Sequence, residues 1–396
     1  MNDKPAILGS KPIFSERIPF VRPSLPPYES LSPQIAEIFR TGMLTKGKYL
    51  RELERRLSEH IGVKHVICVS SCTLGLMLTY QGLGLKGEVI VPSFTFMATV
   101  HPLVWNGATP IFVDVDPNTW NIDPERVEEA ITERTTAIVA VHNFGNPADV
   151  EELEGIALRH GLKLVFDAAH GFGSLYKGKP VGSFGDVEVF SVTPTKLLVA
   201  GEGGVVATDD DILAEHIRTG REYGNDGHYG SNFPGLNARM PEFNAILGLK
   251  SLEMLEENAL CRNRIATTIK KRLGRLPGIT FQHVRPGNRS SYKDFCILID
   301  SETFGIDRDE LAIALKAENI DTRKYHYPPV HTHKAYDHLP RRSLPITDYI
   351  SSRILCLPIW SHMDDDIVDR MCSAIERIHR YNDEVRKVLT FGRQES

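Results

Sequence analysis

Between residues 63 and 166 the sequence alternates short apolar runs with longer amphipathic stretches. The apolar runs predict strands at 63–69, 88–92, 109–115, 137–141 and 163–166, and the stretches between them predict helices at 70–82, up to 105, at 124–131 and at 150–160. The predicted strands are apolar throughout, which is typical of parallel strands covered on both faces. Two more strands are predicted at 186–192 and 204–208, after which the alternation stops. The sequence therefore predicts an α/β fold with a mostly parallel central sheet covered by helices.

The regions on either side of this alternation differ from it. Prolines are frequent in residues 1–33, which predicts an extended N-terminal arm, and a helical pattern broken by a turn at 42–47 follows up to Ile61. One long helix is predicted at 241–269. Beyond Pro277 the pattern predicts strands at 279–282 and 294–299 and helices at 308–318 and 364–386. We therefore expect a large domain over residues 34–262 and a smaller C-terminal α+β domain over residues 263–396.

Composition excludes several classes of protein. The net charge of −5 over 396 residues argues against binding to nucleic acid and against a polybasic membrane surface. Neither a signal peptide nor an apolar stretch of about 18 residues is present, so we expect no membrane segment. The six cysteines are scattered without a CxxC pair, which favours a cytoplasmic protein over a disulfide framework or a zinc site.

Polar side chains follow several predicted strands at the point where each strand ends. Asp167 and His170 come after one buried run, and Ser191 and Lys196 come after another. Ligands of open α/β sheets bind beyond the carboxyl ends of the strands, so we expect these side chains to meet there. Each residue alone is more often a helix cap, a buried histidine or a solvated lysine, and only their combination and order point to a site.

The first predicted strand ends in a turn that suits an anion. Cys72 and Thr73 begin a helix there, where free N–H groups and the helix dipole favour a phosphate, with Ser191 nearby. A lysine amine that can attack an aldehyde and an aspartate that can hold a pyridinium proton complete the arrangement. The combination predicts pyridoxal 5′-phosphate (PLP) held as a Schiff base on Lys196.

Longer segments extend this pattern over most of the chain, from Leu44-Thr-Lys-Gly47 to Leu357-Pro358. They include Pro92-Ser-Phe-Thr-Phe-Met-Ala98, Val141-His-Asn-Phe-Gly-Asn-Pro147, Phe166-Asp-Ala-Ala-His170, Gly201-Glu-Gly-Gly204 and Asn237-Ala-Arg-Met240. In combination they resemble the DegT/DnrJ/EryC1/StrS family of sugar aminotransferases, a branch of the fold-type I PLP-dependent transferases.

This resemblance implies a role for each predicted cofactor residue. Lys196 would form the Schiff base and act as the catalytic base, Asp167 would pair with the pyridine nitrogen, and His170 would lie near the phenolic oxygen. Most relatives have Gln at the position of His170, so the protonation of this imidazole is left open. Phe96 would cover one face of the cofactor, unless it is simply a core residue.

The resemblance also implies a phosphate site and a homodimer. Cys72, Thr73 and Ser191 match the phosphate-binding positions. Asn237 matches an asparagine that reaches the phosphate from the neighbouring subunit, which implies active sites shared between two protomers. In the small domain, Tyr325 and His331 are candidates for contact with the sugar. No metal site is expected, because His331 and His333 lack further ligands at suitable spacing.

The activity that the resemblance implies is a transamination. L-Glutamate would give its amino group to a keto group of a nucleoside-diphosphate keto-deoxysugar, with dTDP as the nucleotide and C-4 as the aminated carbon. The product would be an amino sugar for glycan or natural-product biosynthesis. Lys196 favours transamination over the dehydration of relatives that have His there, whereas Thr193 replaces a His that many relatives have.

Other functions stay open at this point. They are amination at C-3, a PLP-dependent lyase or desulfurase, and a non-catalytic regulator with the same fold. A desulfurase would need a nucleophilic Cys on a mobile loop, and none is evident. An NAD-dependent oxidoreductase fits least, because Ser70-Ser-Cys-Thr-Leu-Gly75 does not supply a GxGxxG motif after the first strand.

Overall fold

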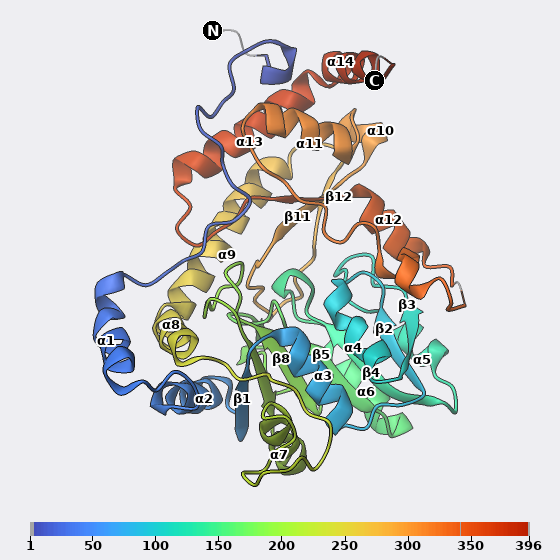
Figure 1. Ribbon diagram of the computed structural model, residues 1–396. Coiled ribbons are helices and arrows are strands. Elements are labelled where there is room, and N and C mark those ends of the chain that lie inside the picture. The colour runs from blue at the N-terminus through green and yellow to red at the C-terminus, as the bar shows by residue number, and fades with distance from the viewer. Residues whose placement is uncertain (1–3, 341, 395–396) are drawn as a thin grey trace.

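A seven-stranded sheet forms the centre of the computed structural model, which describes residues 4–340 and 342–394 (Figure 1). The strand order is β1-β9-β8-β5-β4-β2-β3. The strands are β1 (His65–Val69), β2 (Glu88–Pro92), β3 (Thr109–Val113), β4 (Thr135–Val141), β5 (Lys163–Asp167), β8 (Val187–Ser191) and β9 (Gly204–Thr208). All neighbouring strands are parallel except the pairs that β9 makes with β1 and β8. The predicted α/β fold with a mostly parallel sheet is therefore confirmed.

Helices cover both faces of this sheet. Alternate side chains of β1 point to opposite faces, so that Ile67 belongs to one apolar cluster and Val66 to another. One face packs against α3 (Cys72–Gly82), α4 (His101–Trp105) and α7 (Asp211–Gly220). The other face packs against α2 (Lys48–Ile61), α5 (Pro124–Ala130), α6 (Val150–His160) and α8 (Glu242–Glu253). Burial on both faces explains why the strands are apolar throughout.

A smaller antiparallel sheet lies above the first in Figure 1. It consists of β10 (Ile279–Phe281), β11 (Phe295–Ile299) and β12 (Ile354–Leu357). Its helices are α9 (Leu255–Leu273), α10 (Ser301–Phe304), α11 (Arg308–Ala317), α12 (Pro345–Arg353), α13 (Asp365–Arg380) and α14 (Asn382–Gln394). A hairpin of β6 (Leu175–Tyr176) and β7 (Lys179–Pro180) and 3₁₀ helices at Ala6–Leu8, Tyr28–Ser30, Met97–Thr99, Asn143–Gly145, Val330–Thr332 and Lys334–Tyr336 lie in the connections.

The N-terminal arm runs along the smaller sheet and its helices before it reaches α1 (Ser32–Thr41) (Figure 1). It is attached at the buried carboxylate of Glu318, which accepts hydrogen bonds from the N–H groups of Ala6 and Ile13 at 2.8 and 2.7 Å. Arg377 of α13 pairs with the same carboxylate at 2.6 Å. The arm therefore packs on its own chain.

Several elements differ from the prediction. The helix predicted at 241–269 is two helices, α8 and α9, which meet at Met254, and the helix predicted at 364–386 is divided into α13 and α14 near Tyr381. The amphipathic pattern continues across both breaks, so it does not mark them. The helices α7 and α12 and the strand β12 were not predicted. The domain boundaries stay predictions, and residues 1–3, 341 and 395–396 of the predicted arm and small domain lie outside the described residues.

Two absences concern the described residues alone. Within residues 4–340 and 342–394, each helix is too short or too polar to cross a lipid bilayer. In the same ranges, no three His, Cys, Asp or Glu side chains come together as a bound metal ion would require.

Candidate active site

A cavity of about 340 Å³ opens at the carboxyl ends of the parallel strands. It brings together residues that are far apart in the sequence, from the start of α3, the segment after β2, the ends of β5 and β8, the residues before β11 and the loop after α11. Among the predicted site residues, those that line it are Cys72, Thr73, Phe96, Asp167, His170, Ser191, Lys196 and Tyr325. The position of the cavity follows the rule for open α/β sheets.

Lys196 follows β8 and lies at the wall of this cavity. Burial lowers the pKa of its amine to about 7, and the positive charge of Lys293 acts in the same direction. At neutral pH a large fraction of the amine is therefore unprotonated. An unprotonated lysine can attack an aldehyde and can accept a proton, which is the chemistry predicted for this residue.

Asp167 ends β5 and is only 5% exposed. Its Oδ2 accepts a hydrogen bond from the Thr99 hydroxyl at 2.7 Å, and its Oδ1 accepts one from the N–H of Ala169 at 3.0 Å. Burial raises the pKa of the carboxyl group, while these two hydrogen bonds oppose the rise. The donors hold the carboxylate in place and favour its ionised form, so it can pair with a cation in the cavity.

The Thr99 hydroxyl is itself supported by a second hydroxyl. Thr95 Oγ1 lies 2.8 Å from Thr99 Oγ1, and both side chains are buried. A hydroxyl group has one proton. Because Thr99 donates that proton to Asp167, it accepts from Thr95. The two threonines thus form a chain of hydrogen bonds that ends on the Asp167 carboxylate.

His170 has a defined proton position. Its Nδ1 accepts a hydrogen bond from the backbone N–H of Phe144 at 3.1 Å. Burial lowers the pKa of the imidazole well below its usual value, and the charge of Lys196 adds to this effect. The ring is therefore neutral, with its proton on Nε2, and it can donate a hydrogen bond. The sequence left this protonation open, and the contact with Phe144 decides it.

The start of α3 forms an anion cradle. Ser71 caps this helix, and its Oγ accepts a hydrogen bond from the N–H of Leu74 at 3.2 Å. The N–H groups of Cys72 and Thr73, in the first turn, have no partner within the helix. Gly204 packs against this first turn, and a Cβ atom at Gly204 would come within 2.6 Å of the Cys72 nitrogen. The cradle therefore requires a glycine at this point of β9.

Three predicted residues differ from the others in exposure or position. Phe96 lines the cavity, but 51% of its surface is exposed, so one face of its ring is accessible from the cavity. Asn237 is exposed and lies outside the lining of the cavity. His331 also lies outside it, because its Nδ1 and its backbone N–H both bind the Ser93 hydroxyl, at 2.7 and 2.9 Å. The predicted roles of these residues stay predictions.

The sequence analysis missed Lys293, Asp294 and His326, which also line the cavity. Lys293 and Asp294 precede β11, and a charged pair directly before a buried apolar run was the available signal. His326 follows Tyr325, and its ring stacks on Phe144 with centroids 5.5 Å apart. Burial lowers the pKa of His326 to about 3, so this imidazole is neutral as well.

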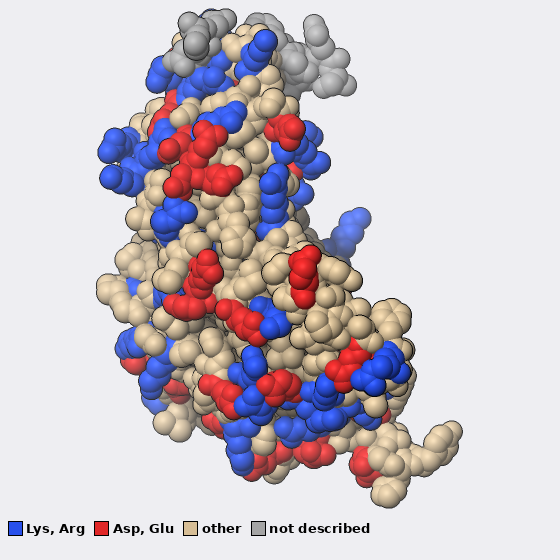
Figure 2. All heavy atoms as spheres, turned by 90° about the vertical axis from the view of Figure 1, so that its left-hand side faces the viewer, with Lys and Arg blue, Asp and Glu red and all other residues tan. Residues whose placement is uncertain are grey.

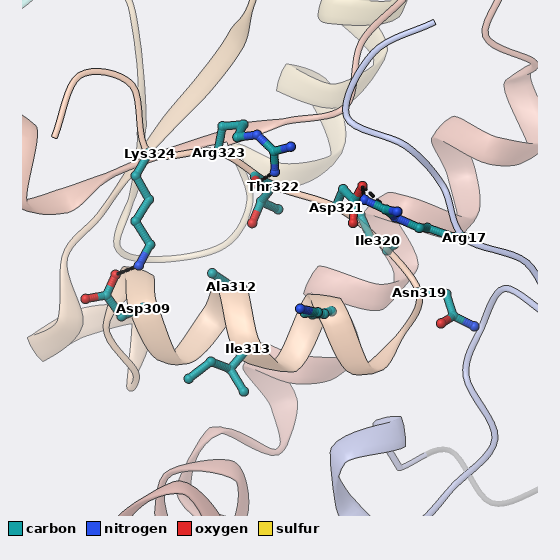
Figure 3. A pocket seen from close by; sticks show the side chains of 11 residues that line it. Arg17, Asp309, Ala312, Ile313, Asn319, Ile320, Asp321, Thr322, Arg323 and Lys324 are labelled. Atoms are coloured by element: carbon teal, nitrogen blue, oxygen red, sulfur yellow. Dashed lines mark hydrogen bonds and ion pairs between the residues drawn. The ribbon is translucent and has the colours of Figure 1, made fainter. Parts of the chain in front are cut away.

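A second cavity, of about 650 Å³, lies beside α11 (Figure 3). Figure 3 shows that its charged side chains are largely engaged with one another, since Lys324 points to Asp309 and Arg17 to Asp321. None of the predicted site residues lines this cavity. The chemistry therefore belongs to the smaller cavity at the strand ends.

Comparison with known proteins agrees with this arrangement. The model of the DegT/DnrJ/EryC1/StrS aminotransferase family matches residues 28–376. The chain belongs to this family. The family is PLP-dependent, and the chain is therefore an aminotransferase of a PLP-dependent family.

Individual relatives cover nearly the whole chain. The dTDP-4-amino-4,6-dideoxy-D-glucose transaminase of Escherichia coli is 36% identical over 366 residues, which are 90% of this chain and 98% of the relative. The solved structure of DesI in the presence of its TDP-sugar product has a TM-score of 0.91 at 36% identity and covers 100% of both chains. S. venezuelae DesV in complex with a ketimine intermediate has a TM-score of 0.84 at 33% identity, over 93% of this chain and 99% of DesV.

Proposed function

We propose that the protein transfers the amino group of L-glutamate to C-4 of a dTDP-linked 4-keto-6-deoxy sugar, with PLP as its cofactor. One observation carries the choice of acceptor. The relative that matches 90% of the chain is a transaminase named for dTDP-4-amino-4,6-dideoxy-D-glucose. The similarity to DesI, which was solved with a TDP-sugar product, supports the same class of acceptor.

The residues that line the cavity fit PLP at three separate points. The N–H groups of Cys72 and Thr73 suit its phosphate, the Asp167 carboxylate suits a protonated ring nitrogen, and the Lys196 amine suits its aldehyde. The neutral His170 can donate from Nε2 to the phenolic oxygen. When bound, the cofactor supplies an aldehyde that carries the amino group between substrates and a ring that withdraws electrons.

The residues of the chain would then divide the proton chemistry among them. Asp167, held by Thr99, keeps the ring nitrogen protonated. Lys196, with its pKa lowered to about 7, would accept the proton from the substrate carbon next to the amino group and hold it on its amine. A lysine with an ordinary pKa near 10.4 would be almost fully protonated at neutral pH and could not serve as that base.

A homodimer with shared active sites is part of the proposal. The side of the molecule that carries α1 and α2 (Figure 2) has exposed apolar side chains on α1, on the turn that follows it and at the start of α8: Phe39, Met43, Leu44 and Phe243. The rings of Phe39 and Phe243 lie 5.9 Å apart, so they form one apolar surface. Asn237 is exposed, so it is available to contact the phosphate site of a second copy, as the resemblance to the family implies.

The direct test is a product assay. The enzyme is incubated with PLP, L-glutamate and dTDP-4-keto-6-deoxyglucose, and the sugar product is identified by NMR. We expect an amine at C-4 and an equal amount of 2-oxoglutarate, and we expect neither with the Lys196→Ala variant. An amine at C-3 from the corresponding 3-keto sugar, or no amino sugar from either acceptor, would contradict the proposal.

A further inference from the structure

Lys293 and Asp294 form a buried ion pair in the wall of the active-site cavity. Their side chains are 8% and 2% exposed, and Lys293 Nζ lies 2.9 Å from each carboxylate oxygen of Asp294. The amine also lies 5.5 Å from the centre of the Tyr325 ring, which lines the same cavity. Apart from the effect of the Lys293 charge on the pKa of Lys196, the proposed chemistry of Lys196, Asp167 and His170 makes no use of this pair.

A third buried group, the guanidinium of Arg262, gives this cluster a net positive charge. Arg262 of α9 is 1% exposed, and it donates to the backbone carbonyls of Tyr292 and Lys293, both at 3.0 Å. Burial lowers the pKa of Arg262 to about 10, so it is still charged at neutral pH, and in the described part of the chain no carboxylate forms an ion pair with it. Two cations therefore share the single carboxylate of Asp294. Buried charges are normally balanced, which indicates that an anion completes the cluster.

An unpartnered atom lies in the same wall. His326 Nε2 is fully buried, and it has no hydrogen-bond partner among residues 4–340 and 342–394. His326 and Lys293 both line the cavity with Lys196. A ligand with two oxygen atoms could accept from the lysine and from the imidazole together.

We propose that Lys293 binds the carboxylate next to the reacting amino group of the amino-acid donor, in competition with its partner Asp294. This inference rests on the proposed function. In that function the donor must place a negative carboxylate close to Lys196, and in the described lining of the cavity Lys293 is the cation that the roles of Lys196 and the neutral imidazoles leave available. His326 would supply a second contact to the same group. The keto sugar has no such carboxylate, so Lys293 would distinguish the two substrates.

The test compares two nucleophiles on the PLP-loaded enzyme. Aminooxyacetate and methoxyamine both react with an enzyme-bound aldehyde, but only aminooxyacetate has a carboxylate. We expect Lys293→Met to lower the rate constant of aminooxyacetate by about 10- to 150-fold, which is the value of one charged hydrogen bond, and to leave that of methoxyamine within about threefold. The binding of glutarate, measured by calorimetry, should weaken by a similar factor.

Lys324→Met is the matched control. Lys324 also pairs with an aspartate, Asp309, and precedes Tyr325, but it lines the cavity of Figure 3 instead of the active site. We expect wild-type values for both nucleophiles and for glutarate. If Lys293→Met does not fold, Asp294→Asn serves in its place. It frees Lys293 from its partner and should increase the preference for aminooxyacetate over methoxyamine.

The outcomes separate this inference from the proposed function. Equal slowing of both nucleophiles by Lys293→Met would mean that Lys293 acts through Lys196 or through the fold, and it would overturn the inference. Unchanged rates, or a lower preference for aminooxyacetate in Asp294→Asn, would also overturn it. A wild-type enzyme that binds PLP and prefers aminooxyacetate but does not react with L-glutamate would instead reject glutamate as the donor.

Discussion

Replacing Thr99 by Val tests whether the hydroxyl chain on Asp167 matters for catalysis. Thr99 Oγ1 donates to the Asp167 carboxylate at 2.7 Å from a fully buried position. A hydrogen bond to a charged group contributes about 1.5–3 kcal/mol. Without it, the pKa of Asp167 rises further, so a larger fraction of this carboxyl group is protonated and cannot pair with a protonated ring nitrogen. If this energy is lost from the transition state, the donor half-reaction slows by about 10- to 150-fold.

The structure also predicts how stability changes in this series. Thr99→Val leaves the buried Thr95 hydroxyl without an acceptor, at a cost of about 1–3 kcal/mol in the free energy of unfolding. Adding Thr95→Val removes that unpaired hydroxyl, so the double variant should regain stability while the half-reaction stays slow. Thr95→Val alone should slow the half-reaction by less than about threefold, because it only weakens the neighbouring bond.

The assay follows the visible absorption band of the enzyme after mixing with L-glutamate in a stopped-flow instrument, and urea denaturation gives the stability. Thr99→Ser keeps the hydroxyl and is the control. A Thr99→Val variant as fast as Thr99→Ser would refute the role of this hydrogen bond. A double variant that regains both stability and speed would assign the defect to the unpaired Thr95 instead.

Three other predictions concern the amine, the apolar surface and the core. In the enzyme freed of cofactor, the rate at which an acylating reagent labels the Lys196 amine should rise through about pH 7, because the protonated amine below that pH is unreactive. The labelling rate of exposed lysines should rise near pH 10.4 instead. Mass spectrometry of the labelled peptides measures both, and a midpoint near pH 10.4 for Lys196 would show that burial does not lower its pKa. Phe39→Asp should convert the proposed dimer into monomers in sedimentation velocity, whereas Ile212→Asp on α7, at a similarly exposed position, should not. A monomeric wild type would count against the shared site. Glu188→Ala should lower the free energy of unfolding, measured by urea denaturation, by about 3–5 kcal/mol. The change leaves the buried His142 and the N–H groups of Gly182 and Phe184 without their acceptor. A loss below about 1 kcal/mol would contradict this account.

The central sheet was predictable because burial on both faces leaves a strong local pattern. The runs at 88–92 and 204–208 coincide with β2 and β9. The direction of β9 was not predictable, since an apolar run reads the same in parallel and antiparallel strands. The strand β12 has four residues between α12 and a loop, and nothing local distinguishes so short a run from the end of a helix.

The site was predictable where a residue lies at the end of a buried strand or shortly after it. Asp167 ends β5, Lys196 follows β8 in the next loop, and the fold brings both to one cavity. Lys293, just before β11, and His326, in the loop after α11, reach the cavity from outside the central sheet, at a place that tertiary packing sets. His331 illustrates the converse, because a residue six positions from Tyr325 is held instead by Ser93, outside the cavity.

The attachment of the arm at Glu318 has a consequence for the two ends of the chain. Proteolytic trimming beyond Ile13 would strip two of the three partners from a carboxylate that has no access to water. The loss of stability would affect the end of α11 and its contact with α13, which are far from the arm in the sequence, and it would not affect the parallel sheet. Residues 6–13 thus stabilise the end of α11 and its contact with α13, so a protein trimmed at its amino end should show faster amide exchange in these two helices.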